Sequence, residues 1–554
     1  MSEDCYPVTA LPHTSALFRD YVSGASSVLD AFYSPLRNDM AWMRKPSAMD
    51  ARHRASIVKL LTEQNKNFGA ETGTLANLER LSAGASAVVT GQQVGLFGGP
   101  LLTLLKAATA IRRADDATRA GHPHVPIFWL ASEDHDRAEA NHAVFPEIAR
   151  PQSAEGETET PQPPNRLRTL RLPSAAAAVP VGNLALGKGI APLLAELKPL
   201  LGEGPAHALL ASLYTPDATY AEAFGKLMMR VFARHGLIVI DPAPRAFHAL
   251  ARPVLRAAIE QAIPLQAALM QRSRALEAAG YAAQVLVAEE SSLLFLLEEK
   301  TGARLALKTP AAKKAAWTAG AKNYSTAELL AILEAEPERI SPNALLRPVM
   351  QDALLPTSAY IGGPAEIAYF AQSQVVYEAI LKRATPILPR LSATLVDGGS
   401  ARLLTRHGLE LTDLFAGPDA LAQRLGARYM PVEGKRRLSA AGETLDRELI
   451  ALMAWMESLD AGLGRSAGTA ASKMRYQMNR LRRLAANFEL NREQMLRRHA
   501  HKLCQMLYPG GQLQERVLAS AWFLQSGSES LATLLVHSAG GERAGHRVIR
   551  GAGF

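Results

Sequence analysis

The chain has 554 residues, 48% of them apolar, which makes it too long for one ordinary core and too hydrophobic for a disordered protein. Its 61 basic and 52 acidic residues leave a net charge of +9, a mild excess that suits small anionic ligands as well as nucleic acid. It lacks an apolar run of membrane-spanning length and contains only Cys5 and Cys504, so we expect a cytoplasmic protein without a disulfide framework.

The first predicted unit is a strand, a glycine-rich loop and an amphipathic helix. Residues 87–90 (AVVT) predict a short buried strand, and the loop GQQVGLFGG follows at 91–99. We expect the helix to begin at Pro100, with Lys106 on its polar face. A second buried strand, 125–131, runs into a charged loop, SEDHD.

An insertion is predicted at about 150–214. Residues 151–165 are rich in Pro, Gln, Glu and Thr and break all periodicity, which is typical of an exposed excursion. Regular structure resumes where Thr215 and Pro216 indicate a helix start. The segment LIVID at 237–241 then predicts another buried strand, so the alternation of strands and helices continues.

A second insertion is predicted at about 245–340, with helices and antiparallel strands. Its strands are expected at AQVLVA (283–288), LLFLLE (293–298) and RLALK (304–308). The core returns at 341–374 and closes with a strand in PILPRLSATLV (386–396). This pattern predicts an α/β fold in residues 1–395, a doubly wound sheet that binds ligands at the carboxyl ends of its strands.

The last third is predicted to be helical, over about 396–508, and to contain an antiparallel hairpin at about 440–506. In this hairpin, two apolar repeats with alternating spacings of four and three residues flank a Gly/Ser/Ala turn. A final segment follows at 509–554. The repeats are Leu445, Leu449, Leu452, Met456 and Leu459, then Met474, Met478, Leu481, Ala485 and Phe488. Because an isolated hairpin leaves one apolar flank exposed, we expect a homodimer formed through this coiled coil.

Two glycine pairs, each followed by proline, are candidate anion sites. Gly98 and Gly99 precede Pro100, and Gly362 and Gly363 precede a second helix, so each pair is expected at a helix N-terminus. A glycine cap leaves the first N–H groups of a helix open to a carboxylate or phosphate. Close backbone packing in a tight turn is the alternative explanation.

The first loop matches neither the dinucleotide fingerprint nor the Walker motif, which disfavours redox cofactors and P-loop chemistry. Gln92 and Gln93 instead offer neutral donors and acceptors, which suit the orientation of an amide, amine or hydroxyl. With Thr90 and Gly91 at the strand end, we expect them to bind substrate. Simple capping of the loop is the alternative for the two glutamines.

The SEDHD loop crowds ionisable groups at the end of a buried strand. Flanked by carboxylates, His135 could accept a proton from an attacking amine, with Asp134 or Asp136 orienting its ring. Asn141 nearby is expected to position a substrate. One alternative is a metal site formed by His135, His142 and a carboxylate. Another is a structural role, in which the acids cap the next helix. We predict no metal site.

Polar residues flank the second glycine pair. Arg347 and Gln351 are spaced to share one helix face before it, and Glu366 and Tyr369 share a face of the helix that follows. We expect these four side chains to bind substrate, although a solvated helix face would give the same spacing.

Arg390 and Ser392 stand in the closing strand and are also candidate substrate ligands. A buried arginine at a strand end often binds a carboxylate. It can equally pair with a structural acid, and the sequence leaves both explanations open.

Three long segments carry a resemblance to a known family. The segments VVTGQQVGLFGGPLLTLLKA, VPIFWLASEDHDRAEANH and SPNALLRPVMQDALLPTSAYIGGPAEIAYFAQSQ resemble the bacillithiol biosynthesis cysteine-adding enzymes. YTPDATYAEAFGKLMMRVFARHGLIVIDP, ILPRLSATLVD and LYPGGQLQERVL are also similar to that family. The resemblance implies a Rossmann-like core with connecting-peptide insertions, a dimerising coiled coil and a terminal segment that returns to the core.

The resemblance further implies that cysteine is joined, as an amide, to the glucosamine amine of glucosaminyl malate. Because an amide forms from a free carboxylate only after activation, we expect ATP as a cosubstrate. On this hypothesis the helix termini hold anions, His135 takes the amine proton, and Arg347 or Arg390 neutralises a carboxylate.

Two other functions remain open at this stage. A class I synthetase-like enzyme could activate an amino acid for another acceptor such as tRNA, but the His-Ile-Gly-His motif is absent and Ser472-Lys473-Met474 lies in the coiled-coil pattern. A solvated flank explains the basic hairpin without nucleic acid. A non-catalytic dimeric scaffold is the third possibility, and the charged loop disfavours it.

Overall fold

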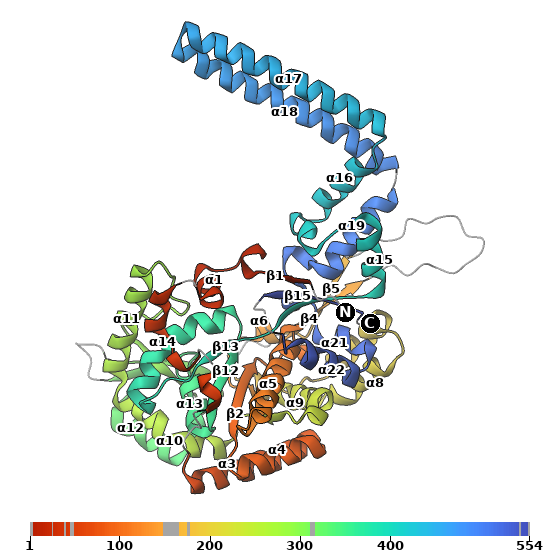
Figure 1. Cartoon of the computed structure of the whole chain (residues 1–554). Coiled ribbons are helices and arrows are strands. Elements are labelled where there is room, and N and C mark those ends of the chain that lie inside the picture. The colour runs from red at the N-terminus through yellow and green to blue at the C-terminus, as the bar shows by residue number, and fades with distance from the viewer. Residues whose placement is uncertain are drawn as a thin grey trace. The chain divides into compact units, whose positions relative to one another are not determined.

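The structure is a computed structural model of the whole chain (Figure 1). It describes residues 4–24, 26–37, 40–44, 49–147, 166–173, 178–310, 316–492, 494–541 and 545–551. The predicted excursion at 151–165 lies outside these residues. The chain forms two compact units. The first comprises Met1–Phe145, Arg168–Leu395 and Gln514–Phe554, and the second comprises Pro146–Leu167 and Val396–Leu513.

A five-stranded parallel sheet forms the centre of the first unit. Its strands, in sheet order, are β13 (Ile387–Pro389), β12 (Thr357–Gly362), β2 (Ser86–Gln92), β3 (His124–Leu130) and β6 (Ile238–Ile240). The chain starts at β2, proceeds through β3 to β6, and then returns to the other side of β2. The strand order therefore reverses between β2 and β12, which is the topological switch point of a doubly wound fold.

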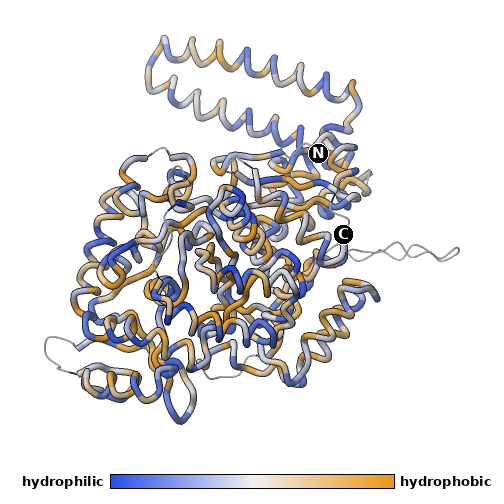
Figure 2. The backbone as a smooth tube through the Cα atoms, turned by 60° about the horizontal axis from the view of Figure 1, so that its bottom comes forward, coloured by the Kyte–Doolittle hydropathy of each residue, from blue (hydrophilic) through white to orange (hydrophobic). Residues whose placement is uncertain are grey.

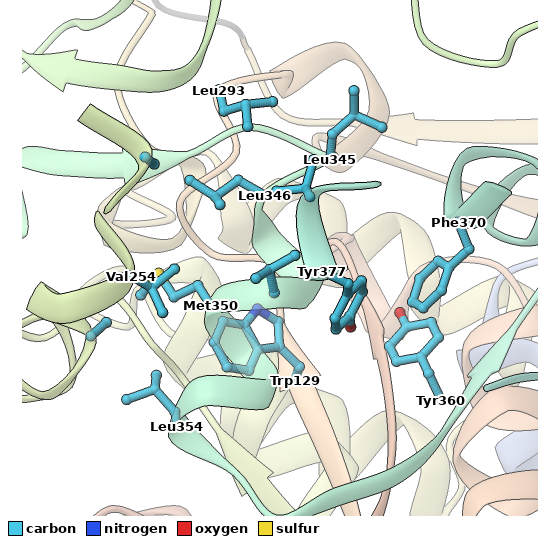
Figure 3. Packing of buried hydrophobic residues seen from close by; sticks show 14 of the residues in the cluster. Trp129, Val254, Leu293, Leu345, Leu346, Met350, Leu354, Tyr360, Phe370 and Tyr377 are labelled. Atoms are coloured by element: carbon cyan, nitrogen blue, oxygen red, sulfur yellow. The ribbon is translucent and has the colours of Figure 1, made fainter. Parts of the chain in front are cut away.

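Helices cover both faces of this sheet because successive strand residues point to opposite faces. Val88 packs with alanines of α5 (Leu102–Arg119), whereas Ala87 and Val89 belong to the larger cluster on the other face. That cluster joins Trp129 of β3 to Met350 and Leu354 of α13 (Arg347–Leu354) and to Val254 of α10 (Arg245–Glu260) (Figure 3). The predicted α/β, Rossmann-like fold is confirmed.

The segment between β6 and α13 contains a second, antiparallel sheet. Its strands, in sheet order, are β10 (Lys322–Tyr324), β9 (Trp317–Ala319), β8 (Arg304–Lys308), β7 (Ser291–Leu297) and β11 (Ile340–Pro342). The helices α10, α11 (Ala262–Ala278) and α12 (Thr326–Ala335) accompany it. The strands predicted at 293–298 and 304–308 are therefore confirmed.

The strand predicted at 283–288 does not form. The backbone N–H of Val285 donates to Gln372 Oε1 at 2.9 Å, and Gln372 Nε2 donates to the Val285 carbonyl at 2.8 Å. A buried side chain of α14 (Pro364–Leu381) thus satisfies the groups that a neighbouring strand would otherwise pair. Leu286, beside Val285, is 92% exposed, whereas Val285 and Val287 pack against the core cluster.

Two predicted helix starts are also wrong. The helix expected from Thr215 is α9 (Tyr220–Phe232), and the hydroxyl of Thr219 caps it by accepting from Glu222 N at 3.2 Å. The helix expected from Pro100 is α5, which begins at Leu102, because Pro100 makes an isolated β-bridge with Ala519. In both cases a pairing or cap further along the chain sets the boundary.

The second unit is helical. It contains α15 (Gly398–His407), α16 (Pro418–Tyr429), α17 (Val432–Leu459), α18 (Ala461–Arg492) and α19 (Gln494–Leu507). The helices α17 and α18 run side by side as an antiparallel hairpin, and hydrophobic and hydrophilic positions alternate along both (Figures 1 and 2). The predicted helical coiled-coil domain is confirmed.

The turn of this hairpin differs from the prediction. We expected the Gly/Ser/Ala run after Leu459 to break the helix, but the break is confined to Asp460. The carboxylate of Asp460 accepts from Leu463 N at 2.9 Å and caps α18, so the glycines and serines that follow remain helical.

Both ends of the described chain meet in a three-stranded sheet of order β1 (Asp4–Tyr6), β15 (His546–Arg550) and β14 (Ser392–Val396). The segment Gln514–Phe554 accordingly belongs to the first unit. Among the described residues, no helix is both long enough and apolar enough to cross a membrane.

Candidate functional site

A buried lysine lies at the switch point of the parallel sheet. Lys106 projects from α5, and its ammonium donates to the Gly91 carbonyl at 2.6 Å and to Gln92 Oε1 at 2.9 Å. The same ammonium lies 2.6 Å from Glu366 Oε2 of α14. Burial lowers the pKa of Lys106, although Glu366 opposes this effect. The pair therefore links the carboxyl end of β2 to the helix after β12.

The second glycine pair opens α14 as predicted, with Gly363 at the cap and Pro364 at the first helical position. Glu366 covers part of this terminus, because its Oε2 accepts from Gly363 N at 2.8 Å. Its Oε1 accepts from Tyr360 OH at 2.7 Å. Burial alone would raise the pKa of Glu366, but Lys106 and these donors hold it below its usual range.

A buried arginine extends this network. Arg347 of α13 donates from Nη1 to Gln351 Oε1 at 3.1 Å and from Nη2 to Tyr369 OH at 2.9 Å. It also lies 3.4 Å from Tyr360 OH. Burial lowers the pKa of Arg347, but the neighbouring tyrosines and Glu366 outweigh burial and raise it. The four residues predicted around the second glycine pair are thus brought together.

The SEDHD loop joins the same edge of the sheet. Gln93, which follows β2, donates from Nε2 to Asp134 Oδ2 at 2.6 Å, and Asp134 Oδ1 accepts from Asp136 N at 3.2 Å. The other amide atom of Gln93, Oε1, is buried without a hydrogen-bond partner among the described residues. An unpaired buried acceptor at a loop of this kind is suited to a ligand donor.

His135 is oriented by a residue that sequence reasoning missed. Its Nδ1 lies 3.2 Å from Arg304 Nη1, whereas Asp134 Oδ1 is 3.8 Å away and too far for a hydrogen bond. The prediction that Asp134 orients the ring is therefore wrong. Arg304 comes from β8 of the second insertion, and no local spacing connects it with residue 135.

A buried ion pair supports the base of this loop and was also missed. Glu133 Oε1 lies 2.8 Å from Nε2 of His248, a fully buried histidine of α10. Burial lowers the pKa of His248, but the Glu133 charge outweighs burial, so the pKa lies above its usual value.

Asp136 has a structural role in place of the predicted catalytic role, whereas Asn141 uses only part of its side chain for structure. Asp136 is exposed and caps α6 (Arg137–Ala140) by accepting from Ala138 N and Glu139 N. Asn141 donates from Nδ2 to the Leu172 carbonyl at 3.1 Å, and its backbone carbonyl accepts from Leu172 N. Its Oδ1 is buried without a hydrogen-bond partner among the described residues. Helix capping thus uses Asp136, while the predicted substrate-binding role of Asn141 stays a prediction.

The first glycine pair is not an open helix terminus. Gly98 and Gly99 are buried at positive φ, before the start of α5. Gly98 N donates to Tyr214 OH at 3.1 Å, and Ser520 donates to the Gly98 and Gly99 carbonyls. A Cβ on Gly98 would meet Leu227 and Ser520 at 3.0 and 3.1 Å. Close packing, the alternative considered from sequence, explains this pair, and the predicted anion site is wrong.

Arg390, Ser392 and Thr90 bind protein groups. Arg390 Nη2 lies 2.6 Å from Glu515 Oε1 in a pair whose side chains are 4% and 1% exposed. Ser392 donates to the same oxygen at 3.0 Å, and Thr90 donates to the Ile361 carbonyl across the sheet. The predicted role of Arg390 and Ser392 as substrate ligands is therefore replaced by pairing with a structural acid.

Within the described part of the chain, no three His, Cys, Asp or Glu side chains gather closely enough to hold a metal ion. His135 and His142 thus do not form the metal site considered from sequence. The residues that converge at the switch point are Gly91, Gln92, Gln93, Asp134, Gly363 and Glu366, held by Lys106 and Arg347. They provide neutral amides, a helix N-terminus and paired charges.

Comparisons with known proteins cover both units. The N-terminal Rossmann-like domain of bacillithiol biosynthesis BshC matches residues 1–391, and the C-terminal coiled-coil domain of the same family matches residues 393–550. Relatives that are provisionally named cysteine ligase BshC align over almost their full length. One from Koribacter versatilis (strain Ellin345) is 41% identical over 99% of this chain and 100% of its own. One from Solibacter usitatus (strain Ellin6076) is 36% identical, over 98% and 99%.

Proposed function

The chain belongs to the bacillithiol biosynthesis BshC family, and from this premise we propose that it ligates cysteine to the glucosamine amine of glucosaminyl malate. The observation that carries the proposal is the family match over both units, together with a polar network at the switch point. Such a rim is where doubly wound enzymes bind their ligands. In the reaction, the amine nitrogen bonds to the cysteine carbonyl carbon, the activated carboxyl oxygen leaves with its activating group, and the amine releases one proton.

The N-terminus of α14 is our proposed site for a substrate carboxylate. Gly363 carries no side chain that would cover the helix end, and Pro364 has no N–H group, so the amides that follow in the first turn are the donors that a carboxylate would use. Lys106 and Arg347 add positive charge behind this terminus, and Glu366 balances part of it. A carboxylate of malate or of cysteine fits this chemistry.

Gln92 and Gln93 are our proposed residues for orienting the acceptor amine and hydroxyls. Each glutamine has one amide atom held by the protein: Gln92 Oε1 by Lys106, and Gln93 Nε2 by Asp134. The remaining amide atoms, Gln92 Nε2 and Gln93 Oε1, provide one donor and one acceptor. Since both side chains are fixed in this way, a substrate would meet preorganised groups.

We propose ATP as the cosubstrate that activates the cysteine carboxyl group. The support is chemical, because a free carboxylate does not react with an amine at a useful rate in water. Cytoplasmic ATP and reduced cysteine supply the reaction in this scheme.

Product formation tests the proposed function. Purified protein is incubated with cysteine and glucosaminyl malate, with and without ATP, and bacillithiol is measured by mass. We expect ATP-dependent product, and Lys106→Met should reduce it strongly. Product without any nucleotide would contradict the role of ATP, and absence of product under every condition would contradict the function. A matched control is Lys308→Met, whose side chain is 60% exposed on β8.

We also propose that the chain forms a homodimer through the hairpin. Large apolar side chains lie exposed on it, including Trp455 at 57% and Phe488 at 67%. A second copy with the same stripe would cover them. Trp455→Glu with Phe488→Glu should convert a dimer into a monomer in analytical ultracentrifugation, whereas Arg436→Glu at an exposed polar position should not. A wild-type monomer at micromolar concentration would contradict the proposal.

A further inference from the structure

Arg304 is held rigidly beside the charged loop. Its guanidinium donates from Nε to Ser341 Oγ at 3.0 Å and from Nη2 to the Pro342 carbonyl at 2.6 Å. It also lies over the ring of Phe295, 3.8 Å from the ring centroid. These partners come from β11 and β7, and Arg304 is 8% exposed. Burial lowers the pKa of its guanidinium, although the charges of Glu133 and Asp134 oppose this effect. The position of the guanidinium is thus fixed by partners on two other strands of the same sheet.

The remaining nitrogen of this guanidinium determines which tautomer His135 adopts. Arg304 Nη1 lies 3.2 Å from His135 Nδ1. Arginine has five N–H donors and no acceptor, so this contact is a hydrogen bond only when Nδ1 carries a lone pair. Neutral His135 must then carry its proton on Nε2. A protonated Nδ1 would place two donors face to face.

The nearby carboxylate does not reverse this assignment. Asp134 Oδ1 lies 3.8 Å from His135 Nδ1 and accepts from Asp136 N, and Asp134 Oδ2 accepts from Gln93. Both oxygens of Asp134 are therefore engaged elsewhere. In an Asp–His pair that prepares a base, the carboxylate would instead bind an Nδ1–H group and leave a lone pair on Nε2.

We propose that Arg304 is a positioning residue that holds His135 in its Nε2–H form, so that His135 donates a hydrogen bond to an anionic oxygen of the substrate. Within the described chain Nε2 has no hydrogen-bond partner, and the His135 side chain is 35% exposed, so this donor can reach a ligand. The inference rests on the proposed function for the identity of the ligand. It also reassigns His135, since a nitrogen that carries a proton cannot accept one from the amine.

Two oxygens share this chemistry, a malate carboxylate and the oxyanion that develops at the cysteine carbonyl. Loss of the hydrogen bond to one or the other oxygen changes different kinetic constants. Loss of a contact to the malate carboxylate raises KM for glucosaminyl malate, whereas loss of a contact to the developing oxyanion lowers kcat and leaves KM unchanged.

The tautomer is tested in the full-length protein without substrate. The protein is labelled with ¹⁵N-histidine and studied by NMR over a series of increasing pH, and the His135 signals are assigned by their loss in His135→Gln. The tautomer is determined where these signals no longer change with pH. We expect an Nε2–H form in the wild type and in Arg304→Lys, which keeps a donor. Arg304→Met, checked for folding by its unfolding curve, should give a mixture of tautomers, and Lys308→Met on the same strand should behave as wild type. An Nδ1–H form in the wild type, or an unchanged tautomer in Arg304→Met, would overturn the proposal.

The kinetics of His135 variants distinguish a hydrogen-bond donor from a general base. Glutamine retains an N–H donor but cannot take up a proton, so His135→Gln should keep activity within about tenfold of wild type. His135→Ala should lower kcat by about 10²–10³-fold if the partner is the developing oxyanion, the usual effect of removing one donor to a developing charge, and should raise KM for glucosaminyl malate if the partner is the malate carboxylate. Equal losses in the two variants would contradict the donor role. If wild type forms no product, the proposed function fails, while the NMR result still decides the tautomer.

Discussion

The ammonium of Lys106 and the carboxylate of Glu366 lie 2.6 Å apart, with side chains only 4% and 16% exposed. They belong to α5 and α14, the helices that follow the two strands at the switch point. The ion pair therefore connects the two halves of the doubly wound sheet at the edge where the proposed substrates bind. Its geometry sets the positions of Gly91, Gln92 and Gly363 together.

Removing one member of this pair should be far more damaging than removing both. Lys106→Met leaves a buried carboxylate without its partner, and Glu366→Gln leaves a buried ammonium, so each should cost about 3–5 kcal/mol of unfolding free energy. The double variant leaves no unpaired buried charge and should lose less than either single variant. Urea unfolding followed by circular dichroism measures all three variants. The exposed pair Lys198 and Glu203 is the control, and its removal should leave the transition nearly unchanged.

Gln93 and Asp134 should be coupled in activity. Gln93→Glu places a carboxylate 2.6 Å from Asp134 Oδ2, and repulsion should displace the SEDHD loop. A displacement of about 1 Å can lower the rate about 10²-fold. Adding Asp134→Asn restores a donor opposite the new acid and should recover most of the activity. Steady-state kcat/KM values measure the effect, and failure of the second change to restore activity would refute the coupling.

Gly91 should tolerate no side chain. A Cβ at this position would lie 2.7 Å from the Trp129 carbonyl oxygen, and a backbone atom cannot move aside easily. Gly91→Ala should therefore destabilise the protein by about 1–3 kcal/mol and reduce activity, since Gly91 also accepts from Lys106. Gly468 lies in open space on α18, so Gly468→Ala should leave the free energy of unfolding unchanged or raise it by up to about 1 kcal/mol. Thermal unfolding of both variants provides the comparison.

His546 should make stability depend on pH. Burial lowers its pKa to about 4, and its two ring nitrogens lie 2.8 Å from the hydroxyls of Ser392 and Thr394. The unfolded chain takes up the proton at about pH 6.5, before the folded chain does. The stability linked to neutral His546 is thus complete above about pH 6.5 and is lost as pH falls to about 4, with a total on the order of 3 kcal/mol.

The variant His546→Gln isolates this contribution. It should flatten the decrease in unfolding free energy between about pH 6.5 and 4 relative to wild type, because glutamine does not titrate. Urea unfolding at several pH values in this window measures the two slopes. Parallel slopes in the two proteins would show that His546 is not the group responsible.

Local patterns predicted the elements of the site better than their partners. The strand before Gly91, the charged loop after the second strand and the Pro364 helix start follow from short-range periodicity and capping rules, and all three are present. Arg390 shows the limit, because a buried arginine at a strand end looks the same whether its carboxylate belongs to a substrate or to the protein. Its partner, Glu515, lies in the C-terminal segment.

The role of Lys106 could not be predicted from its position on the helix. Its spacing places it on the polar side of α5, where solvent exposure is the usual outcome, yet the side chain lies buried over the sheet. Only the return of the chain through β12 supplies Glu366 and makes burial of the ammonium tolerable. Arg304 and His135 are likewise brought together by the antiparallel insertion.

The sequence by itself determined the α/β class, the coiled-coil hairpin, the glycine-rich loop and the family, because these depend on periodicities and motifs carried by contiguous residues. The tertiary structure alone decided which charges pair, which glycines are packed shut and which tautomer of His135 is stable. These properties depend on atoms within about 3 Å of one another, contributed by residues far apart in the chain, and hydrogen bonds and buried charges are sensitive to that distance.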